Sequence, residues 1–136
     1  MTSFPLKIVS PDGMEFEGMV EEVVVRTTTG DMGVLAGHVN CVAPLGMGRA
    51  TVVIDGQKRY GACIGGILSV SDGKVTLVTT TFEWAEDIDQ ERAAKAADRA
   101  QAVLNNKNAA NTDLIVAEAK LKRALVRKSV ADYRTK

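Results

Sequence analysis

Glycine and proline are confined to the first part of this chain, whereas alanine is concentrated in the rest. All 12 glycines lie at or before Gly73, and all three prolines lie at or before Pro44. Alanine occurs four times before residue 85 and 13 times from there on. Glycine and proline mark turns, while alanine has the highest helix propensity. The sequence therefore predicts two domains, residues 1–85 and residues 86–136.

The first domain is predicted to consist of β-strands. β-Branched runs such as Val20–Thr27 and Ala50–Ile54 are bounded by turn residues, and Asp55-Gly56 is a strong hairpin signal. The run Val75–Thr79 alternates between apolar and polar residues. Many short strands with frequent turns are typical of an antiparallel sandwich or barrel.

The second domain is predicted to form two helices of about 20 residues, or roughly 30 Å each. A capping box of Asp87 and Gln90 is expected to start the first helix, and Asn111 or Thr112 to cap the second. Apolar residues recur at helical spacing in both segments, which a short polar loop joins, so we expect an antiparallel hairpin. The first stripe is Ala93, Ala97, Ala100 and Leu104, and the second is Leu114, Ala117, Leu121 and Ala124.

An alanine seam is expected to hold the hairpin weakly. Burying a methyl group contributes about 1 kcal/mol or less, against about 2–3 kcal/mol for a leucine side chain. An isolated helix of this length is marginal in water. We therefore expect the hairpin to open readily.

The zero net charge conceals an asymmetry. Residues 1–90 carry 6 Lys and Arg against 12 Asp and Glu, whereas residues 91–136 carry 11 against 5. A basic tail of this kind favours an acidic partner or the acidic part of the same chain. Aromatic residues are too scarce, at 4%, to favour nucleic-acid recognition by base stacking.

Neither a catalytic site nor a membrane-crossing segment is indicated. Gly73-Lys74 lacks the other residues of a phosphate-binding loop, and His38 is interpreted as a structural hydrogen-bonding residue. The N-terminus lacks a secretory signal, and the longest uncharged run is interrupted by polar and turn residues. Cys41 and Cys63 match no zinc spacing and are expected to be buried thiols of a reducing cytosol.

Three segments of the chain resemble the epsilon subunit of F-type ATP synthase. They are FPLKIVSPDGMEFEGMVEEVVVRTTTGDMGVLAGH at 4–38, GGILSVSDGKVTLV at 65–78 and EDIDQERAAKAADRA at 86–100. The resemblance covers nearly the whole chain, and it implies a ten-stranded antiparallel β-sandwich followed by an α-helical hairpin. Asn40 departs from the pattern, because the family often has proline there.

The resemblance also implies a function and partners. The chain would be a non-catalytic rotor subunit that needs no cofactor and whose sandwich binds the gamma subunit and the c-ring. The loop that carries Asp31 and Met32, with His38 nearby, would face the c-ring. The extended hairpin would enter the catalytic alpha/beta hexamer and inhibit ATP hydrolysis. Membrane association, on the cytoplasmic face of the bacterial plasma membrane, would occur only through the complex.

The second helix is basic, which suits entry into a partner lined with carboxylates. The same charges could instead form a solvated polar face. The basic residues are Lys120, Lys122, Arg123, Arg127 and Lys128.

Some members of the family bind ATP in the compact state through an Ile/Leu-Asp-x-x-Arg-Ala motif. Residues 88–93 match that motif in full, and supporting positions are matched on both helices. The resemblance therefore implies a regulatory ATP site, with ATP stabilising the compact hairpin. Its residues would be Glu83, Ile88, Asp89, Arg92, Ala93, Arg99, Arg123 and Arg127.

Helix geometry places Asp89, Arg92 and Arg99 on one side of the first helix, around small alanines. A base could lie on the methyl groups while the arginines bind phosphates. On the second helix, Arg127 borders the apolar stripe but Arg123 is expected to point away from it. An ordinary surface pair of Asp89 with Arg92 remains the alternative.

A different class of function is also compatible with the pattern. The chain could be a free-standing β-sandwich binding module in which the helical hairpin mediates oligomerisation. That interpretation accounts for the strands and the apolar stripes, but not for the joint presence of segment 30–38 and the motif at 88–93.

Overall fold

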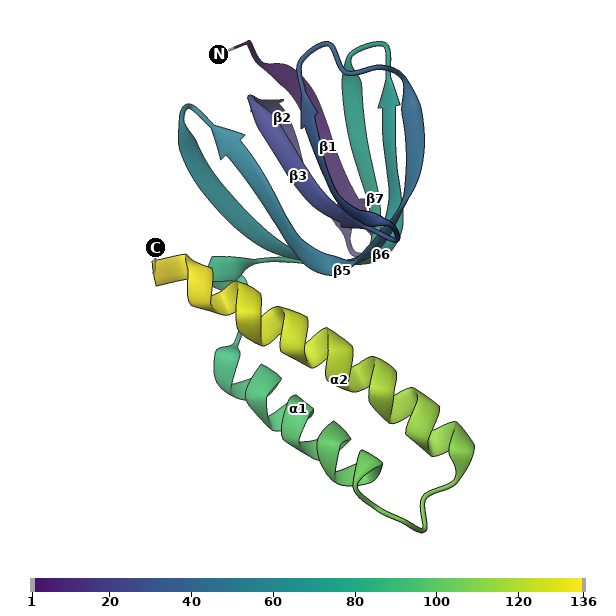
Figure 1. The fold of residues 1–136 in the computed structure, drawn as a ribbon. Coiled ribbons are helices and arrows are strands. Elements are labelled where there is room, and N and C mark those ends of the chain that lie inside the picture. Colours follow the sequence, from purple (N-terminus) through teal and green to yellow (C-terminus); the bar gives the residue numbers. More distant parts are fainter. Residues whose placement is uncertain (1, 136) are drawn as a thin grey trace. The chain divides into compact units, whose positions relative to one another are not determined.

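The computed structural model describes residues 2–135 and divides after Trp84 into two compact units. The first unit is built from strands and the second from helices, as Figure 1 shows. All strands of the described residues precede this division, and all their helices follow it.

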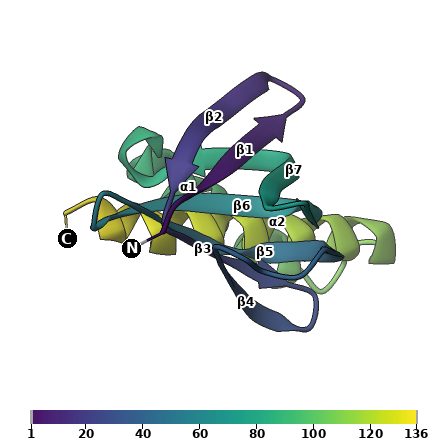
Figure 2. The ribbon, with the colours of Figure 1, turned by 90° about the horizontal axis from the view of Figure 1, so that it is seen from above.

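A single seven-stranded sheet forms the first unit. Its order is β2-β1-β7-β6-β5-β3-β4, so β1 and β2 lie at one side and β3 and β4 at the other (Figure 2). Only β1 and β7 pair in parallel, and the other neighbours are antiparallel. The strands are β1 (Phe4–Ser10), β2 (Gly13–Val20), β3 (Glu22–Thr27), β4 (Gly30–Leu35), β5 (Cys41–Ile54), β6 (Gln57–Ser71) and β7 (Lys74–Trp84).

The expected ten strands are not found; residues 2–135 contain seven. The reason is that β5, β6 and β7 are long, with 14, 15 and 11 residues. Each pairing keeps one register across Gly65: Gly66 pairs with Leu45 and Thr79, and Ile64 pairs with Met47 and Thr81. Gly65 and Gly66 have positive φ angles, +72° and +122°, which L side chains disfavour. Glycines inside a strand often mark a tight bend, and here the pairing continues on both sides of them.

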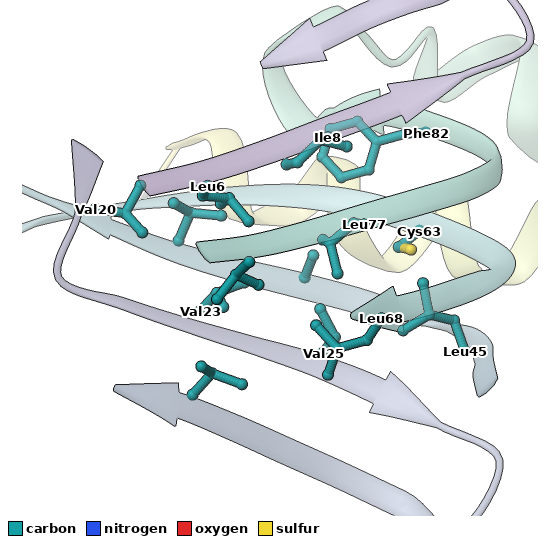
Figure 3. Packing of buried hydrophobic residues seen from close by; sticks show 14 of the residues in the cluster. Leu6, Ile8, Val20, Val23, Val25, Leu45, Cys63, Leu68, Leu77 and Phe82 are labelled. Carbon is teal, nitrogen blue, oxygen red and sulfur yellow. The ribbon is translucent and has the colours of Figure 1, made fainter. Parts of the chain in front are cut away.

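The core of the sandwich consists mainly of aliphatic side chains, together with Phe4, Phe82 and Trp84. Leu6, Ile8, Leu68 and Leu77 are among the fully buried residues, and Figure 3 shows them gathered between strands. The strand and turn predictions around Asp55-Gly56 and the alternating run in β7 are confirmed by the hairpins β5–β6 and β6–β7.

The two cysteines differ in burial. Both are free thiols, but Cys63 is buried in the core whereas Cys41 is only half-buried. The expectation that both are buried is therefore wrong for Cys41. Burial raises the pKa of the Cys63 thiol to about 12, because desolvation disfavours the thiolate.

The second unit is a helical hairpin. A short 3₁₀ turn, Ala85–Asp87, precedes α1 (Gln90–Leu104), and α2 (Asn111–Ala131) is followed by a second 3₁₀ turn, Asp132–Thr135. The predicted apolar stripes are confirmed, since their alanines are buried and their leucines half-buried. The first helix has 15 residues rather than about 20, because the asparagine-rich loop ends it early. The second has 21.

Both predicted helix caps are wrong. Asp89, not Asp87, caps α1, and its carboxylate accepts a hydrogen bond from the backbone N–H of Arg92 at 3.0 Å. Asp87 already belongs to the preceding 3₁₀ turn. At α2 the cap is Ala110, without a side-chain hydrogen bond, because the helix begins one residue earlier than a cap at Asn111 requires.

Candidate functional site

A groove of about 930 Å³ lies between the two helices of the hairpin. This volume is at the upper end of the range usual for small-molecule sites. Alanines of both helices line it together with charged side chains, and we call its lining residues on α2 the α2 wall. Its lining residues are Ala96, Arg99, Ala100, Val103, Asn106, Asn108, Ala109, Ala110, Asp113, Val116, Ala117, Lys120, Arg123, Ala124 and Arg127.

Two rows of side chains with a spacing of seven residues form the α2 wall of the groove. Asp113, Lys120 and Arg127 make one row, and Val116 and Arg123 make the other. Seven residues are close to two turns of an α-helix, so residues at this spacing lie on one side, about 10.5 Å apart along the axis. The α2 wall therefore carries cations in both rows rather than at one isolated position.

The hydrogen bond that joins the ends of the helices shows which residues are level. Gln90 donates through Nε2 to Asp132 Oδ1 at 2.5 Å. In an antiparallel pair, residues at equal sequence distance from such a bond lie opposite each other. Arg99 and Arg123 are both nine residues away from it, and both line the groove, so they stand at about the same level on the two helices. Since Arg123 lines the groove together with Arg127, the expectation that it points away is wrong.

The groove has an excess of positive charge. Four lysine and arginine side chains line it against a single carboxylate, that of Asp113. Within residues 2–135, the side chains of Arg99, Lys120 and Arg123 form no hydrogen bond or ion pair. Guanidinium and ammonium groups around alanines suit a phosphorylated ligand, because charge-assisted hydrogen bonds to phosphate are strong.

Residues of the motif occupy the start of α1. Arg92 is exposed and lies outside the groove lining, but it stands seven residues before Arg99 and thus on the same side of the helix. Its predicted surface pair with Asp89 takes another form, because Asp89 bonds the backbone of Arg92 rather than its guanidinium. Ile88 and Ala93 are buried, so they support the helix through packing.

Glu83 belongs to the other compact unit. It lies on β7, opposite Ala62 of β6, and is half-buried. The structure thus brings together Arg99, Arg123 and Arg127 in one groove, places Arg92 beside it, and puts Glu83 on the sandwich.

The residues expected to face the c-ring are not on one loop. Asp31 and Met32 lie within β4, and Asp31 pairs with Arg26 of β3 at 3.3 Å. Met32 is half-buried and packs against the core, so alternation along the strand turns it away from Asp31. His38 follows β4, and its Nδ1 contacts the carbonyl of Val39 at 2.8 Å, in keeping with a structural role.

Lys120 is the lining cation that the sequence did not assign to this site. The sequence placed it only among the basic residues of the second helix, which suit a carboxylate-lined partner or a solvated face. The available signal was its spacing of seven residues from Arg127, which puts both on one side of the helix.

Residues 2–135 contain neither a metal-binding cluster nor a membrane-spanning helix. No group of three or more histidine, cysteine, aspartate or glutamate residues among them could hold a metal ion. None of the helices described is both long and apolar enough to span a bilayer.

Comparison with protein families gives a match for each part of the chain. Residues 3–85 match the model "ATP synthase, Delta/Epsilon chain, beta-sandwich domain". Residues 86–132 match "ATP synthase, Delta/Epsilon chain, long alpha-helix domain". Both matches are in the order expected from the sequence, and together they cover nearly the whole chain.

Curated relatives and solved structures agree with these matches. The ATP synthase epsilon chain of Bacillus velezensis is 42% identical over 131 residues, covering 96% of this chain and 98% of the relative. That of Bacillus cytotoxicus is 40% identical over 134 residues, covering 98% and 100%. A chain of the Euglena gracilis mitochondrial ATP synthase (OSCP/F1/c-ring) has a TM-score of 0.82 at 27% identity, covering 100% of this chain and 83% of that one. A chain of the Tetrahymena thermophila mitochondrial ATP synthase, from its central stalk and c-ring, shares the fold alone, with a TM-score of 0.65 at 7% identity, covering 93% of this chain and 95% of that one.

Proposed function

The chain belongs to the ATP synthase delta/epsilon family, as an epsilon chain, and from this premise we propose how its two parts work. The sandwich couples the gamma subunit to the c-ring in the central stalk. The hairpin is a regulatory element that, when extended, enters the alpha/beta hexamer and inhibits ATP hydrolysis. In this role the chain is a non-catalytic peripheral subunit, held at the cytoplasmic face of a bacterial membrane through the complex.

ATP is the ligand we propose for the hairpin groove. The observation that carries this proposal is the juxtaposition of Arg99 on α1 with Arg123 on α2, both without an anionic partner among residues 2–135. A polyphosphate between them bridges the two helices and removes their mutual repulsion. The seam is made of alanines, whose burial contributes little to the stability of the closed hairpin. Such a bridge therefore supplies a large part of the free energy that keeps the hairpin closed.

Thermal unfolding of the full chain tests the ATP site. ATP without magnesium is expected to raise the melting temperature, since a ligand at a hundredfold excess over its dissociation constant stabilises by about 2.7 kcal/mol. The variant Arg92→Ala should abolish the shift, and Arg99→Ala and Arg123→Ala should each reduce it. Calorimetry and NMR at millimolar ATP that detect no change in the wild-type chain would rule out this site.

The coupling and inhibitory roles require the assembled enzyme. The full chain is expected to co-purify with gamma, whereas a stable homo-oligomer without affinity for gamma would contradict the proposal. Complexes whose epsilon chain lacks residues after Ile88 should hydrolyse ATP faster than complexes with the full chain. Equal hydrolysis rates would show that the hairpin is not inhibitory.

The alternative of a free-standing binding module has no support in the comparisons. Both halves of the chain match domains of one family, in order, and the relatives align over nearly their full length.

A further inference from the structure

We propose that Lys120 is a ligand-binding residue of the hairpin groove, where its ammonium group contacts the polyphosphate of the bound nucleotide. This inference rests on the proposed ATP site and adds a cation that the motif does not contain. Three observations carry it: the position of Lys120 in the groove, the lack of any partner for its charge among residues 2–135, and its level among the cations along the helix axis.

The position of Lys120 follows from the alanine seam. Lys120 lies three residues after Ala117 and four before Ala124, both of which are buried between the helices. Residues at these spacings share one side of a helix, so the side chain of Lys120 starts beside the seam. It lines the groove, whereas Lys122, two residues further on, does not.

The charge of Lys120 is uncompensated. Within residues 2–135 its ammonium group makes no hydrogen bond or ion pair. Its groove neighbour on α2, Arg123, is one turn away and carries the same charge. Like charges at this distance repel each other, and an anion between them relieves the repulsion. None of the described residues of the hairpin neutralises the charge of Lys120, so an anionic ligand can form the ion pair that this charge lacks.

Along the line of the helix axis, the cations of the groove stand at three successive levels. Counted from the Gln90–Asp132 bond, Arg127 is five residues away, Arg99 and Arg123 are nine, and Lys120 is twelve. At 1.5 Å per residue, these levels span about 10.5 Å from Arg127 to Lys120. A polyphosphate is an extended anion with charge on every phosphate, so it can contact cations at successive levels. A single phosphate or a carboxylate cannot do so.

Titration calorimetry on the full chain, with ATP and with inorganic tripolyphosphate as separate ligands, tests this assignment. Lys120→Ala is expected to weaken binding of both ligands about five- to tenfold, the effect of losing one partly solvated charge-assisted contact. Lys122→Ala is the matched control: it removes the same charge from the same helix and gains the same helix propensity. It should leave both affinities within about twofold of wild type.

The outcomes separate this inference from the proposed site itself. If the wild-type chain binds ATP and Lys120→Ala binds it equally well, the role of Lys120 is refuted while the ATP site stands. If both lysine variants weaken binding equally, the effect is one of overall charge and the specific contact is refuted. If the wild-type chain binds neither ligand, both the site and the role of Lys120 are refuted. Recovery of affinity in Lys120→Arg supports a direct ionic contact.

Discussion

Removing the carboxylate of Asp89 is expected to loosen the hairpin without affecting the sandwich. Asp89 is the N-cap of α1, and its side chain accepts the hydrogen bond of the Arg92 backbone N–H at 3.0 Å. Replacing an aspartate N-cap with alanine typically costs about 1 kcal/mol, within a range of roughly 0.5–2 kcal/mol. Because the alanine seam contributes little per residue, this loss is a substantial fraction of what holds the hairpin closed.

Hydrogen exchange is the appropriate assay, because it reports opening of each unit separately. A loss of about 1 kcal/mol raises the population of the open form about fivefold, so amides of α1 in Asp89→Ala should exchange about fivefold faster. Amides of the buried strands, such as those of Leu68 and Leu77, should be unchanged. In the wild-type chain the hairpin should already exchange faster than these strands, as its alanine seam predicts.

Two variants show whether loss of the cap itself causes the faster exchange. Asp87→Ala removes the neighbouring carboxylate, which forms no hydrogen bond with residues 2–133, and should change exchange in α1 by less than about 0.5 kcal/mol. Asp89→Asn loses the charge but keeps a good capping group, and should behave nearly as wild type. A larger effect for Asp87→Ala than for Asp89→Ala would refute the assignment of the cap.

Two further predictions concern the sandwich. Gly66→Ala should destabilise the sandwich by about 3 kcal/mol or more in denaturant unfolding, because a Cβ atom there would clash with the carbonyl oxygen of Val78. Gly73→Ala is the control: its φ is also positive, at +79°, but the space around it is open, so it should cost only about 1 kcal/mol. Equal costs for the two variants would contradict the steric argument. The Cys63 thiol has its pKa raised by burial from 9.0 to about 12, so its contribution to stability is complete below about pH 9 and is lost as the pH rises towards 12. Unfolding of wild type and Cys63→Ala between about pH 8 and pH 11 should show a steeper decline for wild type, and a thiol reagent at about pH 8 should label Cys41 well before Cys63.

Local sequence signals determined the two-part architecture. Asp55-Gly56 and Asp72-Gly73 specify hairpins through backbone conformations that few other residue pairs adopt, and both aspartates indeed have φ of +51°. The alanine stripes specify the helices and the faces on which they meet, because residues three and four apart lie on the same side of an α-helix.

Tertiary structure alone decided the number of strands, the helix cap and the composition of the groove. Whether Ala50–Ile54 is a strand of its own or part of a longer one depends on pairing with β6 through the bend at Gly65 and Gly66, which is a long-range property. Asp87 and Asp89 are equally good caps by composition, and the 3₁₀ turn before α1 selects the second.

The groove shows the same division. Its charges are present in the sequence, but which of them face one another is set by the offset between two antiparallel helices. The hydrogen bond from Gln90 to Asp132 joins one end of the hairpin and marks that offset. At this offset Arg123 is level with Arg99, and Lys120 stands further along the same groove. The periodicity of the sequence determines on which side of its helix a residue lies. Only the packing of the two helices determines which residues lie opposite each other.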